Sequence, residues 1–480
     1  MVRIARHRVA FSGRSAEGPA TWSQRQMWRL IQLRMPDTAF YNHSLGFELP
    51  DGLALDDVLR QIGLLVERHE SLRTLFRHRD GELTQHVVGP GELDVAVLLA
   101  DGAAESDSRE LFIAHQRGMC ATGFDFAAEL PFRPLVGLVD GTPRGLGFCM
   151  PHVAGDLPAT RLMVAELRTA LAAVAAGEPP PTVPDTRQPL EQAAFERSAR
   201  GRALNDSALR YWRAQLAEFP PTMFPGPALE AARPRFQSGA LESRALRLAL
   251  DVLAARYRVT VSTVALTAVA VVLGAYTGLP RCGMQLIVGN RFVPELRRAV
   301  MNVIQEVPIS IDLRAGAFGE VARGAWRTAM SAYRHGRYDP DDADAAVAEA
   351  GRARGTEVEF GCYFNDVRVP AEPGGGPAAA ATAEEVRAAV PRSRYAPTDL
   401  QERETAYFVL MDGGGVLGGR GDSVVLELSA DSRRIPPPEI ENLLRGVERL
   451  LVELVGREIP PDGLAAATGV MPPAALTGRG

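Results

Sequence analysis

Apolar residues recur every three to four positions along several stretches of this chain, a spacing typical of amphipathic helices. In residues 56–69, five apolar positions share one helical face and are expected to point inward: Val58, Leu59, Ile62, Leu65 and Val66. A final amphipathic helix is predicted over 438–454 and another helix over 318–334. The pattern therefore predicts several helices that bury one face.

Shorter runs of apolar and β-branched residues, bounded by turn residues, predict strands. Asp80-Gly81 and Asp140-Gly141 each separate two such runs, so both dipeptides predict hairpin turns. Further strands are expected at 44–49, 93–99, 243–248, 285–288, 307–312 and 358–364. Strands and helices mix without strict βαβ alternation, which indicates the α+β fold class instead of a doubly wound sheet.

Residues 261–276 carry no charge and are rich in Val, Ala and Leu, so they have to be considered as a membrane span. The segment is shorter than the roughly 20 residues that a spanning helix needs. It also contains Ser262, Thr263 and Thr267. We therefore predict a fully buried core helix.

A chain of 480 residues exceeds what one hydrophobic core comfortably fills, so two lobes are expected. The proline-rich stretch from Gly177 to Pro184 is the best candidate for a boundary. We predict a first lobe over 1–177, a connector over 178–188, a second lobe over 189–459 and a flexible tail over 460–480. Within the first lobe, residues 1–20 are expected to form a loose arm that ends in a short strand.

Charge and cysteine content exclude several classes of function. The formal net charge is only −5, and neither half of the chain carries a basic stripe, which argues against a nucleic-acid partner. The chain contains no lysine. The four cysteines are far apart and show no metal-ligand spacing, which indicates reduced thiols in a cytoplasmic protein: Cys120, Cys149, Cys282 and Cys362. No secretory signal or membrane segment is predicted.

The candidate chemistry lies in residues 145–158, where an apolar run is followed by His152 and Asp156 and then by a helical pattern. One interpretation makes His152 a general base that Asp156 supports. The other makes Asp156 an N-cap ahead of Pro158, a proline suited to the first helical turn, with His152 an ordinary loop residue. The local pattern leaves both interpretations open.

Other catalytic motifs are missing from the sequence. There is no GxSxG elbow and no HExxH or paired His/Cys cluster, which argues against a serine hydrolase and a metal enzyme. The glycines of 413–419 lack P-loop spacing and predict a hairpin loop. A histidine without a nucleophile suits direct transfer, in which the base activates an acceptor amine or hydroxyl.

Three motifs occur in an order that resembles a known family. They are Thr21-Trp-Ser-Gln-Arg-Gln-Met-Trp28, Arg68-His-Glu-Ser-Leu-Arg-Thr-Leu-Phe76 and Met150-Pro-His-Val-Ala-Gly-Asp-Leu157. They resemble the condensation domains of non-ribosomal peptide synthetases, in the chloramphenicol-acetyltransferase-like superfamily. The second matches RHExLRTxF at every specified position, and the third falls where the family has HHxxxDG. The resemblance covers about residues 20–456, so the chain looks like a free-standing condensation-type protein.

The resemblance implies a V-shaped pseudo-dimer of two acetyltransferase-like lobes with a central tunnel, acting as a monomer. Its partners would be an acyl or peptidyl carrier protein, which delivers substrate on phosphopantetheine, and a small-molecule acceptor or second carrier. No bound cofactor, metal, nucleic acid or membrane is expected. His152 would be the catalytic base. Asp156 would be structural, with Arg291 as its ionic partner across the lobes, and Arg73 would support the fold around the site.

The chain departs from the family pattern at two positions of the third motif. Pro151 replaces the first histidine, and Leu157 replaces the glycine after the aspartate. In the family that glycine lies near the tunnel centre. Leu157 would therefore narrow the passage and select a small or unusual acceptor, or it would block catalysis.

Two functions follow from the resemblance. The first is an acyltransferase of specialised-metabolite (antibiotic) biosynthesis, joining a carrier-bound acyl or aminoacyl thioester to an amine or hydroxyl. The alternative is a non-catalytic platform that docks carrier proteins or tailoring enzymes, which the changes at Pro151 and Leu157 motivate. A weaker alternative is an ester-forming acyltransferase of lipid assembly.

Overall fold

The computed structural model describes residues 2–102, 105–368, 381–398, 405–413 and 421–472. The chain forms two compact units that are not continuous in sequence. The first comprises Met1–Asp206, Gly289–Gln305 and Arg337–Pro340, and the second comprises Ser207–Val288, Glu306–Gly336 and Asp341–Gly480. The first unit thus continues through the predicted connector at 178–188 and takes in two later segments.

The first unit is built on a sheet whose described strands have the order β1-β6-β7-β8-β3. These strands are β1 (Val2–Phe11), β3 (Asn42–Glu48), β6 (Gly91–Ala100), β7 (Arg133–Val139) and β8 (Thr142–Pro151). β1 pairs with β6 along its whole length, so the predicted loose arm over 1–20 is wrong. The alternation of basic and apolar residues is that of an edge strand with Arg6 and Arg8 exposed and Val9 packed on the core.

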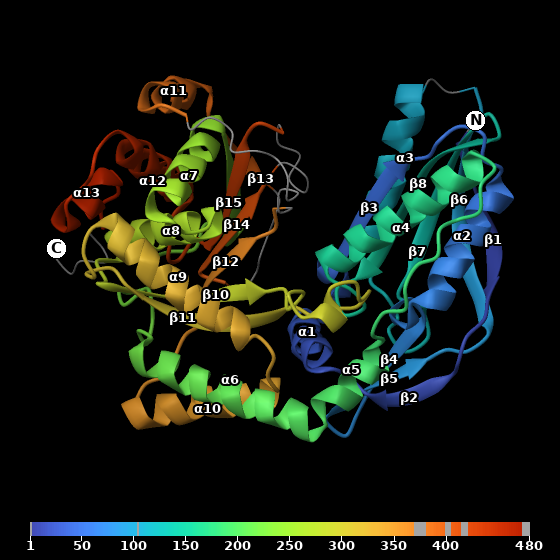
Figure 1. The fold of residues 1–480 in the computed structure, drawn as a ribbon, viewed down its shortest axis with the longest axis horizontal. Helices are drawn as coiled ribbons and strands as arrows, with labels where there is room; N and C mark the ends of the chain where they lie inside the picture. Colours follow the sequence, from blue (N-terminus) through green and yellow to red (C-terminus); the bar gives the residue numbers. More distant parts are fainter. Residues whose placement is uncertain (1, 103–104, 369–380, 399–404, 414–420, 473–480) are drawn as a thin grey trace. The chain divides into compact units, whose positions relative to one another are not determined.

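Helices cover both faces of this sheet (Figure 1). α2 (Leu55–Arg68) and α4 (Leu157–Ala175) pack on one face, where Val136, Leu138, Leu146 and Phe148 join their apolar residues in one core. α3 (Glu105–Cys120) lies on the opposite face. A Cβ at Gly147 would lie 2.8 Å from the Gln116 side chain, so glycine lets α3 approach the strands closely.

A smaller sheet holds the motif that begins at Arg68. Its strands are β2 (Ala16–Pro19), β4 (Thr74–Arg79) and β5 (Glu82–Val87), and a 3-10 turn, η2 (Glu70–Arg73), leads into β4. Asp80 and Gly81 take φ angles of 52° and 81°, which confirms the predicted hairpin turn. Asp140 and Gly141 do the same between β7 and β8, at 48° and 78°.

The second unit contains a mixed sheet whose described strands have the order β11-β10-β12-β14-β15-β9-β13. The strands are β9 (Phe236–Ser243), β10 (Arg281–Val288), β11 (Gln305–Asp312), β12 (Cys362–Asp366), β13 (Arg394–Thr398), β14 (Tyr407–Asp412) and β15 (Val424–Asp431). The strand predicted at 243–248 is wrong. The Ser243 hydroxyl accepts a hydrogen bond from the Leu246 backbone N–H at 2.8 Å, so it caps α7 (Arg244–Tyr257), and the strand ends where the helix begins.

The helices α7, α8 (Val261–Thr277), α9 (Phe318–Arg334) and α12 (Pro437–Gly456) pack on one another and on this sheet. All residues of α8 from Thr263 to Thr277 are buried, which confirms the predicted core helix. In the described part of the chain, no single helix is long and apolar enough to cross a membrane. Among these residues only α7 and α8 taken together reach the necessary length and apolar composition, and they are bent by 104° at their junction.

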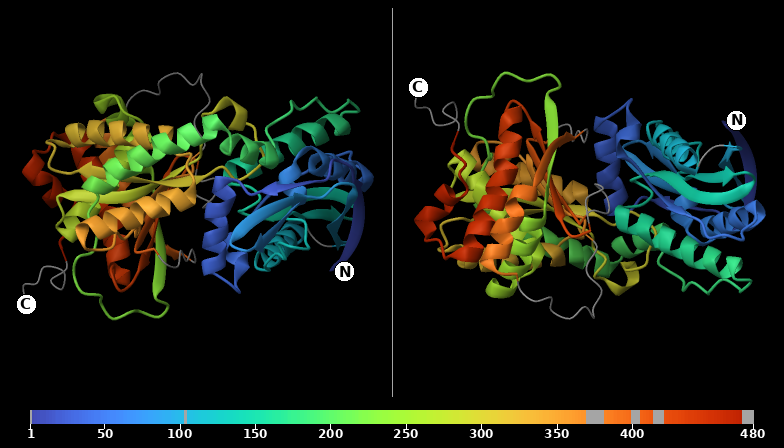
Figure 2. Two further views of the ribbon diagram at one scale, coloured as in Figure 1. Left: turned by 90° about the horizontal axis from the view of Figure 1, so that it is seen from below. Right: turned by 90° about the horizontal axis from the view of Figure 1, so that it is seen from above.

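Two further helices lie side by side (Figures 1 and 2), namely α6 (Ala199–Glu218) and α10 (Pro340–Arg354), and most of both belongs to the second unit. Arg354 donates to the Phe219 carbonyl at 2.8 Å and to the Leu216 carbonyl. The predicted tail begins with η5 (Pro461–Gly463) and α13 (Leu464–Ala467), where Leu464 is buried. Residues 473–480 lie outside the described part, as do most of the glycine-rich segment 413–419.

Candidate active site

His152 lies just after the end of β8, in the turn that leads into α4. Its backbone N–H donates to the Tyr41 carbonyl at 2.8 Å, which fixes the chain beside the start of β3. The imidazole is half-buried. Two rigid elements therefore hold the turn on which the candidate base is placed.

Asp156 is the N-cap of α4 and is also the acceptor in a buried ion pair. Its Oδ1 accepts from the Ala159 backbone N–H at 2.8 Å and from Arg291 Nη2 at 2.5 Å, and its Oδ2 accepts from the Val303 N–H at 3.1 Å. The carboxylate is fully buried. Because these three donors occupy it, Asp156 anchors the start of α4 to the segment 289–305.

Arg291 is held as firmly as its partner. Its guanidinium also donates to the backbone carbonyls of Leu296, Ala299 and Met301 at 2.8–3.1 Å. The segment 289–305 belongs to the first compact unit, so the Asp156–Arg291 pair lies within one unit and not across the lobes as the resemblance implied. Charge-assisted bonds of this kind are strong and directional.

The environment of His152 favours a neutral ring. Burial lowers the pKa of His152, while its own backbone carbonyl and the Asp156 charge oppose that shift only in part. Nδ1 is buried and makes no hydrogen bond of good geometry to the described residues. Nε2 is thus the ring nitrogen left to meet a substrate, and at neutral pH it carries the lone pair that a general base needs when the proton resides on Nδ1.

The structure brings a second histidine, which the sequence analysis missed, next to His152. His43 pairs with Met150 in the β3–β8 register, and its ring centroid lies 5.4 Å from that of His152. His43 Nε2 lies 2.8 Å from the Thr160 hydroxyl. Burial, with a smaller contribution from His152, lowers the pKa of His43 to about 3. Only the pairing of β3 with β8, 107 residues apart in sequence (150 − 43), reveals this neighbour.

The two departures from the family pattern flank the turn. Pro151 is the last residue of β8, is buried, and pairs with Asn42. Leu157 is the first residue of α4 and is half-buried, directly after the Asp156 cap. A proline ends a strand without leaving an unpaired N–H, so Pro151 is compatible with its place.

Arg73 makes its contacts elsewhere in the first unit. Its guanidinium is buried and donates to the backbone carbonyls of Arg14 at 2.9 Å, Val66 at 3.2 Å and Val88, and Glu70 Oε1 lies 3.8 Å away. These partners join β2, α2 and β5 through their flanking segments. Arg73 thus ties together the smaller sheet and α2, while its described contacts do not include His152, Asp156 or Arg291.

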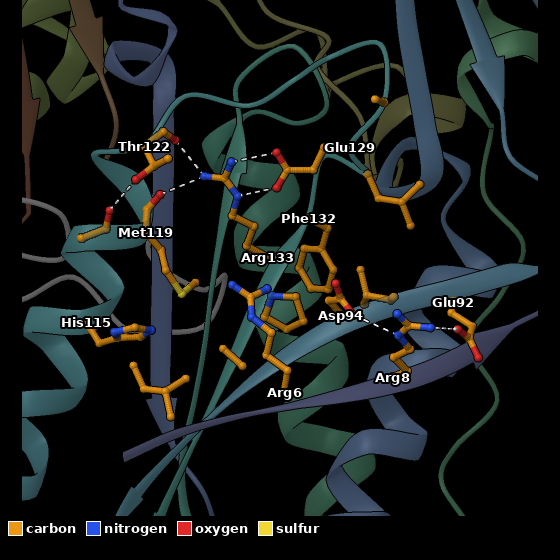
Figure 3. Close-up of a pocket in the computed structure, with 17 residues that line it drawn as sticks. Arg6, Arg8, Glu92, Asp94, His115, Met119, Thr122, Glu129, Phe132 and Arg133 are labelled. Carbon is orange, nitrogen blue, oxygen red and sulfur yellow. Dashed lines mark hydrogen bonds and ion pairs between the residues drawn. The ribbon is translucent and has the colours of Figure 1, made fainter. Parts of the chain in front are cut away.

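A hollow of the first unit is a separate feature (Figure 3). It has a volume of about 820 Å³ and lies between β1, β6, α3 and the segment 128–134. Arg133 is held there by Glu129 at 2.6 Å and Arg8 by Glu92 at 3.2 Å, so these charges are paired within the protein. The lining contains none of the residues predicted to form the site. Within the described residues, no group of three or more His, Cys, Asp or Glu side chains is placed to hold a metal ion.

Comparisons with known proteins agree with the motif order. The sequence profile of the Condensation domain matches residues 15–353. The chain is 29% identical over 225 residues to a probable non-canonical nonribosomal peptide synthetase of Salinispora arenicola, which covers 45% of this chain and 3% of that protein. It is 25% identical over 337 residues to the isonitrile lipopeptide synthase of Mycobacterium tuberculosis, covering 67% and 13%. The chain therefore spans a small part of these relatives.

Solved structures show the same fold. The X-domain in its complex with OxyB from teicoplanin biosynthesis superposes with a TM-score of 0.68 at 16% identity, over 93% of this chain and 95% of that one. The SgcC5 protein from Streptomyces globisporus gives 0.67 at 19% identity, over 92% and 99%. The fold is thus the chloramphenicol-acetyltransferase-like α+β fold, and the chain belongs to the condensation-domain family.

Proposed function

We propose that this chain is a condensation-type acyltransferase that joins a carrier-bound acyl or aminoacyl thioester to an amine or hydroxyl in specialised-metabolite biosynthesis. The observation that carries the proposal is the half-buried imidazole of His152, whose pKa is lowered by burial, held on a turn whose exit is anchored by the Asp156–Arg291 pair. Family membership supplies the reaction class, and the phosphopantetheine arm of a carrier protein would supply the thioester.

The proposed acyl transfer needs no bound cofactor. The acceptor nitrogen or oxygen attacks the thioester carbonyl while His152 Nε2 takes the N–H or O–H proton. The carbon–sulfur bond then breaks, and the proton passes to the departing pantetheine thiolate. A positioned base of this kind contributes about 10²–10⁴ in rate, and the orientation of the two substrates supplies much of the rest.

The experiment is a product assay with the intact chain. Carrier proteins loaded with aliphatic, aromatic and aminoacyl groups are incubated with a panel of small amines and alcohols, and amide or ester products are followed by mass spectrometry. Product that depends on the chain and on His152 supports the proposal. Product formed equally by the His152→Ala variant contradicts the assigned role.

Leu157 is proposed to restrict the acceptor. Replacing it by glycine removes four side-chain carbons at the first residue of α4, beside the Asp156 cap. We expect the Leu157→Gly variant to accept bulkier amines, with kcat/KM for the largest acceptor raised about 10-fold or more, since one methylene in an apolar pocket is worth about 10–200-fold. Kinetics over an acceptor size series measure this.

Leu162→Ala, on the same helix, is the matched control for a general loosening of α4. An unchanged size preference in Leu157→Gly would contradict the selectivity role. A gain shared by both variants would show that helix mobility, and not the Leu157 side chain, sets the preference.

The alternative proposal is a non-catalytic docking platform. Pro151 and Leu157 favour it, and so does the X-domain, a neighbour of the same fold whose solved structure is a complex with OxyB. Calorimetric titration with loaded carrier proteins separates the two proposals. Binding without turnover across the acceptor panel would support the platform, whereas turnover that requires His152 would exclude it.

A further inference from the structure

We propose that His43 is a positioning residue that fixes the ring of His152, through an edge-to-face contact on one side and a hydrogen-bonded link to the start of α4 on the other. This rests on the proposed function for its catalytic meaning, although the geometry itself is independent of any substrate.

The contact between the two rings is direct. Their centroids are 5.4 Å apart and their planes are inclined by 74°, which is the edge-to-face arrangement that aromatic rings prefer. His152 needs such a restraint because its Nδ1 has no hydrogen bond of good geometry to the described residues. A ring whose Nδ1 is not held by a hydrogen bond is oriented by packing instead.

The orientation of His43 is fixed in turn by Thr160. The Thr160 hydroxyl lies 2.8 Å from His43 Nε2 and 3.0 Å from the Asp156 backbone carbonyl, which can only accept. When the hydroxyl proton goes to that carbonyl, His43 Nε2 is the donor to the Thr160 oxygen. The chain of contacts thus runs from His152 through His43 and Thr160 to Asp156, the residue that Arg291 anchors.

The strand geometry places His43 on the side of the sheet that α4 covers. Side chains alternate along β3, and Leu45 and Phe47 pack on the core shared with α4, whereas Gly46 faces Gln116 of α3. His43 therefore belongs to the α4 face together with His152 and Thr160. The family pattern places two histidines next to each other in sequence. In this chain, Pro151 precedes His152, and the second imidazole comes from a neighbouring strand.

The first test needs no substrate. Ring ¹H–¹³C relaxation of the full chain, labelled at histidine, reports the rotational freedom of the His152 ring. We expect an ordered ring in the parent protein and a mobile ring in His43→Leu. His43→Phe keeps the edge-to-face contact and is expected to keep the His152 ring ordered. Unchanged mobility of the His152 ring in His43→Leu would overturn the proposal, even if the protein proves to be a docking platform.

The second test is a double-mutant cycle on the reaction. With an acyl-pantetheine thioester and a small primary amine as probes, His43→Leu is expected to lower kcat about 10- to 100-fold with little change in KM, since small misplacements of a reacting group can cost about 10²-fold. In the His152→Ala background the same substitution should cost nothing further. Thr160→Val, which keeps the shape of the side chain, should reproduce part of the loss.

The cycle distinguishes positioning from folding. If the losses in kcat from His43→Leu and His152→Ala multiply in the double variant, His43 acts through the fold and the proposal is overturned. The same holds if the loss in kcat follows a lowered midpoint of thermal unfolding in His43→Leu, His152→Ala and the double variant. If His152→Ala itself retains full activity, the proposed catalytic role fails. The relaxation measurement then still decides whether His43 holds the ring.

Discussion

The His152→Ala variant is expected to lose about 10²- to 10⁴-fold in kcat while binding of the loaded carrier stays within about 2-fold. The reason is that the imidazole serves the proton transfer, whereas the hydrogen bond that fixes the turn comes from the backbone N–H of His152 to Tyr41, and the side chain contributes a ring contact with His43. Product formation by mass spectrometry and carrier titration by calorimetry give the two quantities.

The His115→Ala variant is the matched control, because His115 lies on α3 and lines the separate hollow of Figure 3. It should turn over like the parent protein. Equal losses in both variants would point to a general effect of removing an imidazole, and no loss in His152→Ala would remove His152 from the mechanism.

The assignment of His152 as the general base also predicts how kcat/KM depends on pH. Burial lowers the pKa of His152, so the neutral, active form persists below the ordinary histidine value of 6.5. With a hydroxyl acceptor, which does not itself titrate in this range, kcat/KM should therefore rise with pH through a midpoint below 6.5. The Asp156 and Arg291 charges beside the turn pair with each other, and burial keeps His43 neutral over this range. A midpoint above 6.5 would contradict a buried neutral base.

Local patterns predicted those elements whose causes are local. The hairpin turns at Asp80-Gly81 and Asp140-Gly141 follow from backbone preferences of two residues, and α9 begins and ends at the predicted residues because its apolar spacing is regular. The arm over 1–20 was mispredicted because pairing of β1 with β6 joins residues 80 to 98 positions apart, from Phe11 with Gly91 to Val2 with Ala100. A single sequence contains no record of such a partner.

At the candidate site, too, local sequence predicted what depends on neighbouring residues and missed what depends on residues far apart in the chain. Capping of α4 by Asp156 was one of the two interpretations that the local sequence allowed. The structure shows that the same carboxylate also pairs with Arg291, 135 residues away. The local pattern around Asp156 contains no sign of Arg291, and only the family resemblance named it as the ionic partner. His43 was missed for the same reason, since no motif surrounds it and only the strand register places it beside His152.

Breaking the Asp156–Arg291 pair is expected to destabilise the first unit strongly. Asp156→Ala leaves the Arg291 guanidinium buried without its carboxylate and removes the cap of α4, and losing one partner of a buried pair costs roughly 3–5 kcal/mol. Unfolding of the first unit can be followed by fluorescence of Trp22 and Trp28 in a chain whose other two tryptophans, Trp212 and Trp326, are replaced by phenylalanine.

The exposed pair between Arg8 and Glu92 supplies the control for this prediction. Its side chains are 73% and 58% exposed, so Glu92→Gln should leave the free energy of unfolding almost unchanged. Arg291→Met should be as costly as Asp156→Ala or more so, because three backbone carbonyls lose their donor as well. The double variant should cost less than the sum of the two single variants, since each removes the same bond. Simple addition of the two losses would show that the carboxylate and the guanidinium stabilise the unit independently, and the Asp156 anchor would then be the helix cap alone.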